Sequence, residues 1–184
     1  MKIVNNMKNY VLFIMIIFLA VSNCRNNPDN TPINNNAASI PQHPINPYYS
    51  RTDTMTLNLP DSIWKIVLPD SVYRIARNKE TEAAFSGKYW NSTGKGTYYC
   101  AACGNALFRS DAWFASTCGW PGFFETMRKN SVKYKSDYSY GMIRTEVLCG
   151  RCGAHMGHVF DDGPKPTGQR YCMNSIVLDF VKDK

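Results

Sequence analysis

The segment Thr97-Tyr-Tyr-Cys-Ala-Ala-Cys-Gly-Asn-Ala-Leu-Phe-Arg109 indicates two short strands joined by a cysteine-containing turn. Both ends of the segment, Thr97–Cys100 and Ala106–Arg109, are short runs of aromatic and apolar residues of the kind found in strands. Two residues separate Cys100 from Cys103, and the glycine directly after Cys103 permits the tight turn that brings both sulfurs to one centre. The segment therefore predicts a hairpin that ends in a metal-binding knuckle.

A second segment, Cys149-Gly-Arg-Cys152-Gly, repeats this cysteine spacing. Two such pairs provide the four thiolates of a tetrahedral zinc site, which is closed to substrate and therefore structural. Disulfide bonds are an alternative if the chain is exported to an oxidising compartment. A thioredoxin-like redox pair needs a strand-to-helix context that is absent here. We expect one zinc ion joining two hairpins, with the ligands Cys100, Cys103, Cys149 and Cys152.

The chain after residue 58 predicts a mainly β domain with two short helices at its start. Asp61 can cap a first helix, and Asp70 or Ser71 can cap a second one. No strand is followed by a long amphipathic helix, so the strands are expected to pair in antiparallel fashion. Further strands are expected at Val132–Tyr134, Tyr138–Leu148 and Ser175–Val181.

Composition and charge limit the function classes. The chain has 184 residues, of which 44% are hydrophobic, which suits one domain with appendages. The formal charge of +7 includes two lysines close to the N-terminus, and the remaining excess forms no basic block. Nucleic-acid binding proteins usually cluster their positive charge, so no nucleic-acid partner is expected.

Residues 1–23 are typical of a signal peptide. Two lysines precede the apolar run Tyr10–Val21, which is shorter than the roughly 20 residues that span a membrane. The sequence Val21-Ser-Asn-Cys24 resembles a bacterial lipobox and predicts lipid attachment at Cys24, although Asn23 replaces the usual small residue. Ordinary cleavage after Ser22 and an uncleaved anchor are the alternatives. We expect a lipoprotein anchored to a membrane of the bacterial cell envelope.

The stretch that follows, residues 24–58, is rich in Asn, Pro, Ser and Thr and has no apolar periodicity. Such a composition buries too little apolar surface to offset the entropy of ordering the chain. It therefore predicts a disordered tether, with the folded domain at residues 59–184.

Two further cysteines, Cys118 and Cys172, are candidates for redox chemistry. Arg170 lies two residues before Cys172, at what we expect to be the start of the final strand, and a nearby guanidinium favours the nucleophilic thiolate. Cys118 lies in a loop marked by glycine and proline, where a resolving thiol can move. The alternatives are a buried, unreactive Cys172 and an incidental loop thiol at Cys118.

Two histidines, His155 and His158, follow closely on the second knuckle. They suit proton donation near neutral pH. A second metal site is the alternative, with Asp161 or Asp162 as a third ligand, and it would favour a metal-dependent hydrolase. A non-catalytic zinc-ribbon module that binds a protein or nucleic acid is the other competing class.

Together these features resemble the methionine-R-sulfoxide reductases of the B type, over about residues 64–180. The resemblance implies two antiparallel sheets, one structural zinc ion, and reduction of the R epimer of methionine sulfoxide in peptides or proteins. The landmarks are Phe85-Ser-Gly-Lys-Tyr89, Tyr99-Cys-Ala-Ala-Cys-Gly104, Cys118-Gly-Trp-Pro121, Gly153-Ala-His-Met-Gly-His-Val-Phe160 and Gly168-Gln-Arg-Tyr-Cys-Met-Asn-Ser175.

The resemblance also implies roles for residues that match these motifs. Cys172 matches the catalytic cysteine, which becomes a sulfenic acid, and Cys118 matches the resolving cysteine, which forms a disulfide with it. Arg170 matches the cation near the thiolate. The residues expected to bind the sulfoxide oxygen and its water are His155, His158 and Asn174. The substrate side chain is expected to contact Trp120 and Phe160.

The partners implied by the resemblance are oxidised proteins or peptides and a thioredoxin-like reductant. The chain is expected to act as a monomer. Its departures from the family pattern lie around the resolving cysteine, at Trp113, Ala115, Thr117 and Gly122.

Overall fold

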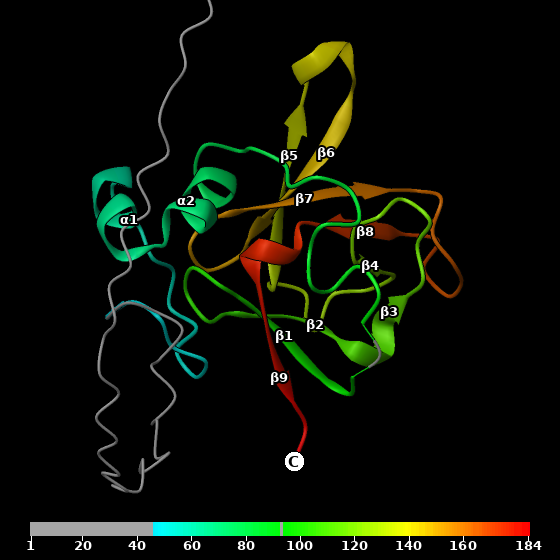
Figure 1. The fold of residues 1–184 in the computed structure, drawn as a ribbon, viewed down its shortest axis with the longest axis horizontal. Helices are drawn as coiled ribbons and strands as arrows, with labels where there is room; N and C mark the ends of the chain where they lie inside the picture. The colour runs from blue at the N-terminus through cyan, green and yellow to red at the C-terminus, as the bar shows by residue number, and fades with distance from the viewer. Residues whose placement is uncertain (1–45, 93) are drawn as a thin grey trace, which may run out of the picture. The chain divides into compact units, whose positions relative to one another are not determined.

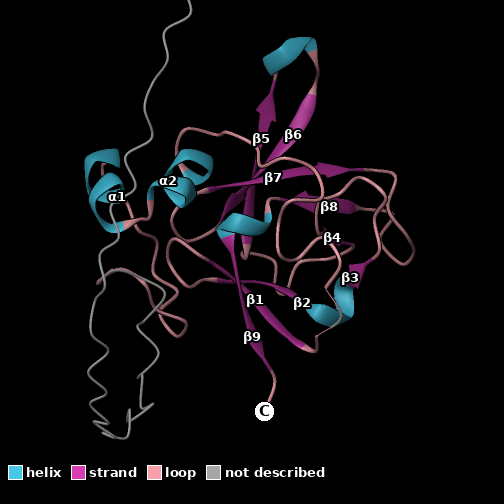
Figure 2. Cartoon of the chain, in the orientation of Figure 1, coloured by secondary structure: helices cyan, strands magenta, loops and turns pink. Residues whose placement is uncertain are grey.

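Two antiparallel sheets form most of residues 46–92 and 94–184, which are the residues that this computed structural model describes (Figures 1 and 2). The smaller sheet has the strand order β2-β1-β9, and the larger sheet has the order β3-β4-β8-β7-β6-β5. The strand pairs in both sheets are antiparallel, which confirms the predicted fold class. The strands are β1 (Gly96–Cys100), β2 (Ala106–Arg109), β3 (Trp113–Phe114), β4 (Gly122–Phe123), β5 (Val132–Asp137), β6 (Arg144–Cys149), β7 (His155–Phe160), β8 (Arg170–Met173) and β9 (Leu178–Lys182).

The two predicted helices are present, α1 (Asp61–Val67) and α2 (Asp70–Ala76). Neither aspartate caps its helix, because Pro60 and Pro69 occupy the cap positions and no side-chain cap bond forms. Asp61 and Asp70 lie in the first turns instead, where a negative charge interacts favourably with the helix dipole. None of the helices among the described residues has the length and apolarity needed to cross a bilayer.

Two predicted strands begin later than expected, because each is preceded by a 3-10 turn. The expected strand Tyr138–Leu148 is η2 (Ser139–Gly141) followed by β6, and the backbone at the turn reaches φ 56° at Tyr140. The expected strand Ser175–Val181 is η3 (Ser175–Val177) followed by β9. A third such turn is η1 (Ser110–Ala112).

Sequence reasoning missed the two-residue strands β3 and β4 and the longer strands β7 and β8. Gly157 and two histidines interrupt the apolar pattern of β7, and β8 is only four residues long, so neither strand carries a strong periodic signal. As a result the expected position of Cys172 is wrong. It lies within β8 and does not open the final strand.

An aromatic cluster joins the two sheets into one core. Phe108 of β2 stacks on Phe123 of β4 with ring centroids 4.4 Å apart, and Tyr98 of β1 meets Phe123 edge-on at 4.9 Å. All three side chains are fully buried. Stacked and edge-to-face aromatic pairs stabilise a core beyond their buried area, so the cluster fixes the smaller sheet against the end of the larger one.

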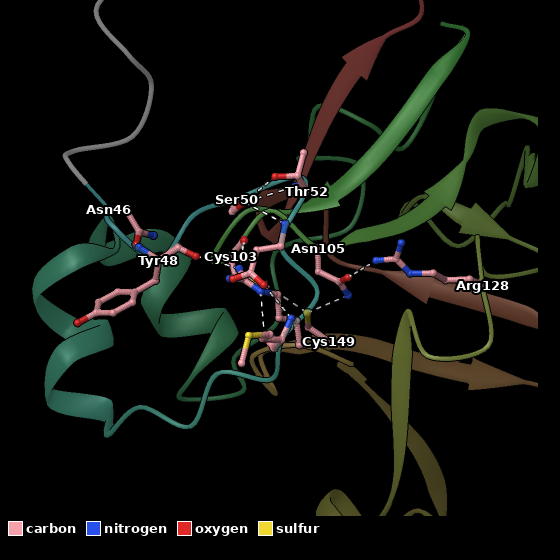
Figure 3. Close-up of polar contacts among 11 residues, drawn as sticks. Asn46, Tyr48, Ser50, Thr52, Cys103, Asn105, Arg128 and Cys149 are labelled. Atoms are coloured by element: carbon pink, nitrogen blue, oxygen red, sulfur yellow. Dashed lines mark hydrogen bonds and ion pairs between the residues drawn. The ribbon is translucent and has the colours of Figure 1, made fainter.

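The folded part of the chain begins earlier than the sequence predicted. Residues 46–57, hereafter the N-terminal segment, lie on the domain, although the predicted tether extends to residue 58. Ser50 N donates to Cys103 O at 3.0 Å, and Leu57 N donates to Arg151 O at 2.8 Å. Figure 3 shows Ser50 and Tyr48 next to Cys103. The signal peptide and the lipid-attachment cysteine Cys24 lie outside the described residues.

The Arg151 guanidinium explains this early start. The side chain is only 3% exposed, and it donates to Tyr48 O and Met55 O and to the carboxylate of Asp53. A buried cation needs such partners, because leaving it unpaired costs several kcal/mol. These contacts join residues about 100 positions apart, so the composition of the segment gives no sign of them.

Candidate active site and metal site

The four knuckle cysteines converge on one buried centre. Cys100 ends β1 and Cys103 lies in the turn that follows it, while Cys149 ends β6 and Cys152 lies in the turn before β7. Their sulfurs all lie within 4.8 Å of one another, and none is in a disulfide. The cluster therefore connects one hairpin of each sheet, as the sequence predicted.

The spacing of these sulfurs fits a tetrahedral metal ion. The distances Cys100 Sγ to Cys152 Sγ and Cys103 Sγ to Cys149 Sγ are 3.8 Å and 3.6 Å. A tetrahedron with metal–sulfur bonds of about 2.3 Å has edges of about 3.8 Å. Asn105 Nδ2 also donates to Cys149 Sγ, and its Oδ1 accepts from Arg128 (Figure 3). The cluster is buried and closed to substrate, so it suits a structural ion.

The remaining two thiols in the described residues face each other at a different place. Cys172 Sγ of β8 lies 3.4 Å from Cys118 Sγ, which belongs to the loop between β3 and β4. The loop meets β8 because β4 pairs with it, with Gly122 opposite Cys172. Ser116 Oγ lies 2.8 Å from Cys118 Sγ and holds the loop thiol in place. The two thiols are close enough to form a disulfide after a small movement.

The surroundings of the two thiols shift their pKa values in opposite directions. Burial and the charge of Cys118 raise the pKa of Cys172 to about 12, although Arg170 lowers it. Burial also acts to raise the pKa of Cys118, but hydrogen bonds with the Ser116 side chain and with the Trp120 backbone outweigh it, and the pKa is lowered. The expected effect of Arg170 on Cys172 is thus present but is outweighed while the thiols are 3.4 Å apart.

A cavity of about 130 Å³ opens beside Cys172. The loop of Cys118 contributes Trp120, and β7 contributes His158 and Phe160. The size of this cavity suits a small side chain, and its aromatic groups suit a thioether or methyl group. The full lining is Thr81, Trp120, Arg144, Gly157, His158, Phe160, Cys172, Met173 and Asn174.

His158 is the histidine that shares the cavity with Cys172. The two residues are register partners of β7 and β8, so their side chains lie on the same face of the sheet. His158 Nε2 donates to Asp137 at 2.8 Å, which leaves Nδ1 as the acceptor atom of the ring. A hydrogen bond from the Ser139 backbone, then the Ser139 hydroxyl and His158, hold the pKa of Asp137 well below its usual value.

His155 lies behind His158 and does not line this cavity. Its side chain is buried, and its Nδ1 lies 2.7 Å from Glu146 Oε1. Burial lowers the pKa of His155, against the raising effect of Glu146. Burial acts to raise the pKa of Glu146, but hydrogen bonds from Lys79 and His155 outweigh it, and the pKa is lowered.

The alternative of a metal site at the two histidines gains no support. Each ring binds a different carboxylate, while Asp161 accepts from Gln169 and Asp162 pairs with Arg170. Within residues 46–92 and 94–184, the four knuckle cysteines are the group whose ligand atoms lie close enough for a metal ion.

Arg170 and Asn174 lie next to the site, and each also binds groups outside it. Both Nε and one terminal nitrogen of Arg170 bind Asp162, and its guanidinium lies 4.3 Å from the centre of the Phe160 ring. Asn174 Oδ1 accepts from Glu82 N, and its Nδ2 donates to Met156 O at 3.2 Å. Asn174 still lines the cavity, and its Nδ2 carries a second hydrogen besides the one donated to Met156 O.

Sequence reasoning missed Glu82, which links three parts of the site. Its carbonyl accepts from Trp120 Nε1 at 3.1 Å, and its backbone N–H donates to Asn174. Its carboxylate accepts from the N–H groups of Ser175 and Ile176, at the start of η3. The only signal in the sequence is its closeness to the Phe85–Tyr89 motif, which says nothing about these contacts.

Two facing thiols, one of which lines a small aromatic cavity, define the chain as a thiol-dependent oxidoreductase. The separate, closed cysteine cluster adds a structural metal site to that class.

Comparison with known proteins identifies the family. The SelR domain matches residues 68–182, which is more than half of the chain. The peptide methionine sulfoxide reductase MsrB of Herminiimonas arsenicoxydans is 52% identical over 120 residues, covering 65% of this chain and 88% of the relative. The MsrB of Teredinibacter turnerae is 50% identical over 124 residues, which cover 67% of this chain and 92% of the relative. The MsrB of Leptospira interrogans is 50% identical over 127 residues, which cover 69% of this chain and 97% of the relative. The chain belongs to the SelR family, the methionine-R-sulfoxide reductases of the B type.

Proposed function

We propose that this chain reduces peptidyl methionine-(R)-S-oxide to methionine, with Cys172 as the nucleophile and Cys118 as the resolving thiol. The observation that carries the proposal is the 3.4 Å distance between the two Sγ atoms beside the Trp120 cavity. The names of the curated relatives, peptide methionine sulfoxide reductases, agree with it.

The reaction proceeds in two balanced steps. Cys172 attacks the sulfoxide sulfur while the sulfoxide oxygen gains a proton; methionine leaves and the oxygen stays on Cys172 as a sulfenic acid. Cys118 then attacks the sulfur of that sulfenic acid, which forms the Cys118–Cys172 disulfide and releases water. The sulfoxide is reduced by two electrons, and the two thiols together supply them.

Proton transfer falls to His158. Its Nδ1 is the ring atom available to take the Cys172 proton, and from the same cavity the imidazole can deliver a proton to the sulfoxide oxygen. Asp137 fixes the tautomer and orientation of the ring. His155 supports this arrangement from behind, with its ring centroid 5.6 Å from that of His158.

The loop of Cys118 also controls when Cys172 becomes a thiolate. Because the charge of Cys118 raises the pKa of Cys172, withdrawal of the loop thiol lowers that pKa and leaves the effect of Arg170 less opposed. Substrate that displaces Cys118 from its contact with Cys172 thus activates the nucleophile. In the second step the loop returns, and its thiol meets the sulfenic acid.

The substrate methyl group binds against Trp120 and Phe160. The indole is held by its hydrogen bond to Glu82 O, and the phenyl ring by the guanidinium of Arg170. Asn174 offers its remaining amide hydrogen to the sulfoxide oxygen. These contacts favour a small methyl thioether over larger groups.

The buried cysteine cluster binds one Zn²⁺ in this proposal. Thiolate ligands in a closed tetrahedral arrangement suit zinc, which has no redox chemistry of its own. The ion supplies folding free energy by joining a hairpin of each sheet. It takes no part in sulfoxide reduction.

The disulfide needs an external dithiol to return the enzyme to its reduced state. A thioredoxin-like donor fits, since thiol–disulfide exchange requires a thiolate that can reach an exposed sulfur. Both sulfurs are partly exposed, and we assign the attack to Cys118 because it lies on a loop whereas Cys172 lies within β8.

We also propose that the domain works in the bacterial cell envelope. The support is in the sequence alone: a signal-like segment at residues 1–23, the lipobox-like cysteine Cys24 and a polar stretch after it. Mass analysis of the mature N-terminus tests this directly, because lipidation at Cys24 adds acyl mass and ordinary cleavage does not.

The reaction is tested with separated R and S epimers of a methionine sulfoxide peptide. With dithiothreitol as reductant, the proposal expects loss of the R epimer and persistence of the S epimer. Reduction of both epimers, or of neither, contradicts it.

A further inference from the structure

The tip of the β5–β6 hairpin, residues 138–143, carries an unusual concentration of exposed apolar side chains. It holds four of the nine large hydrophobic side chains that are exposed among the described residues. Figure 1 shows this tip standing out from the rest of the larger sheet. The exposed fractions are 70% for Tyr138, 89% for Tyr140, 45% for Met142 and 85% for Ile143. Clustered apolar groups of this kind mark binding surfaces, whereas singly scattered ones need no explanation.

The backbone of the tip supports a role outside folding. Tyr140 has φ 56° and ψ 25°, in the left-handed region that a bulky side chain adopts only at an energetic cost. The side chain is 89% exposed, so its contact with the Arg144 guanidinium, 6.0 Å from the ring centre, offsets little of this cost. A glycine would fit the conformation without strain, so folding alone does not account for the tyrosine.

The tip adjoins the catalytic cavity through shared residues. A second cavity of about 290 Å³ lies at its base, and Tyr140 and Ser139 form part of its lining. Thr81, Arg144 and His158 line both this cavity and the one beside Cys172. Arg144 also donates to Asp137 and Ser139, which fixes the base of the tip next to the site. A chain that leaves the catalytic cavity on this side therefore passes along the tip.

We propose that the hairpin tip binds the polypeptide that flanks the methionine sulfoxide, and that it favours apolar flanking residues. This inference rests on the proposed function and adds where a protein substrate is recognised. Methionine side chains usually pack in hydrophobic cores, so an oxidised methionine exposed by unfolding carries apolar neighbours. The tip thus directs the enzyme to unfolded, damaged proteins.

The test compares small and peptide substrates with the same reactive group. The substrates are N-acetyl-methionine-R-sulfoxide and two peptides with a central methionine-R-sulfoxide, one flanked by Leu and Val and the other by Ser and Gly. Dithiothreitol is the reductant, so docking of a protein donor does not enter the measurement. The tip variant is Tyr138→Ser/Ile143→Ser. The matched control is Met55→Ser/Ile66→Ser, which removes side chains that are both 76% exposed.

The tip variant is expected to lose about tenfold in kcat/KM for the Leu/Val peptide, mostly through KM, as the loss of one or two apolar contacts predicts. Its kcat/KM for the small substrate and for the Ser/Gly peptide stays within about twofold of the unmodified chain. The control variant behaves like the unmodified chain on all three substrates. Tyr140→Gly, which relieves the strained backbone, is expected to show the same selective loss without a lower Tm.

Three results overturn the inference. The first is a kcat/KM of the tip variant on the Leu/Val peptide that equals that of the unmodified chain. The second is a loss that appears only when a thioredoxin-like protein replaces dithiothreitol, which assigns the tip to the donor. The third is a wild-type dimer in sedimentation that the tip variant abolishes, which assigns the tip to a second copy of the chain. If the unmodified chain reduces none of the three substrates, the proposed function itself fails, and that outcome is distinct from these three.

Discussion

His158 and Cys172 lie directly opposite each other on β7 and β8, so the imidazole and the thiol share one face of the larger sheet at the edge of the same cavity. Asp137 holds the far side of the ring, 2.8 Å from Nε2. The arrangement resembles a nucleophile, a base and a group that orients the base, which is how many weak nucleophiles are activated.

Replacing His158 with Gln is expected to slow the first reduction step by about a hundredfold, because general acid–base catalysis typically contributes at least that much. KM for the sulfoxide should change little, since the cavity walls formed by Trp120 and Phe160 stay in place. Single-turnover formation of methionine measures the step. An unchanged single-turnover rate in this variant removes His158 from the proton path.

The pKa of Cys172 is expected to fall when Cys118 is replaced by Ala. The charge of Cys118 and its hydrogen bond are, after burial, the causes that raise the pKa of Cys172 to about 12. Without them the thiolate forms at lower pH, assisted by Arg170. The pH dependence of alkylation of Cys172 by iodoacetamide measures this shift. A curve that moves to higher pH, or stays in place, contradicts the role given to the loop.

Stability is expected to depend on pH through His155. Its pKa is lowered from 6.5 by burial, so the unfolded chain binds a proton more readily than the folded one. The contribution of His155 to the unfolding free energy is therefore complete above about pH 6.5 and is lost as the pH falls below that value. Glu146, whose pKa is also lowered, acts in the same direction at lower pH. Urea unfolding of the unmodified chain between pH 7 and pH 5 measures how steeply the unfolding free energy changes with pH.

Two histidine variants test whether His155 causes this pH dependence. His155→Asn should reduce the slope of unfolding free energy with pH in this range. His158→Asn serves as the comparison, because it removes a histidine that is less deeply buried. A His155→Asn variant with the full slope contradicts the assignment.

The N-terminal segment is expected to retain the metal ion of the cysteine cluster. Arg151→Met leaves the acceptors at Tyr48, Cys103 and Asp53 without their buried donor and should cost about 2–4 kcal/mol of unfolding free energy. Zinc release to a chromogenic chelator should become faster as the segment detaches. Arg74→Met is the matched control, since Arg74 forms an exposed pair with Glu80 and its loss should change the unfolding free energy far less. Equal release rates in the two variants contradict the role of the segment.

The cysteine spacing predicted the metal cluster because two closely spaced ligand pairs leave few geometries open. The six-stranded sheet was less visible, since β7 and β8 owe their strand conformation to pairing with each other and with β4 and β6. Local patterns cannot report such tertiary pairing.

Cys118 and Cys172, the two thiols proposed for redox chemistry, lie next to each other as expected, but their surroundings were not foreseen. Burial and the closeness of Cys118 outweigh Arg170 at Cys172, and His155 lies outside the cavity that His158 lines. Glu82 and the contacts of Arg151 were missed because they depend on residues far apart in the chain. The partners of Glu82 and Arg151 can be identified only from the folded structure.

The central claim is that Cys172 and Cys118 join after one turnover. The direct test adds one equivalent of a methionine-R-sulfoxide peptide to the reduced protein without any reductant, then maps disulfides by mass spectrometry. The account predicts one Cys118–Cys172 disulfide, one methionine released per chain, and four knuckle cysteines that remain reduced. Methionine release with Cys118 and Cys172 still unjoined, or with a disulfide among the knuckle cysteines instead, would contradict it.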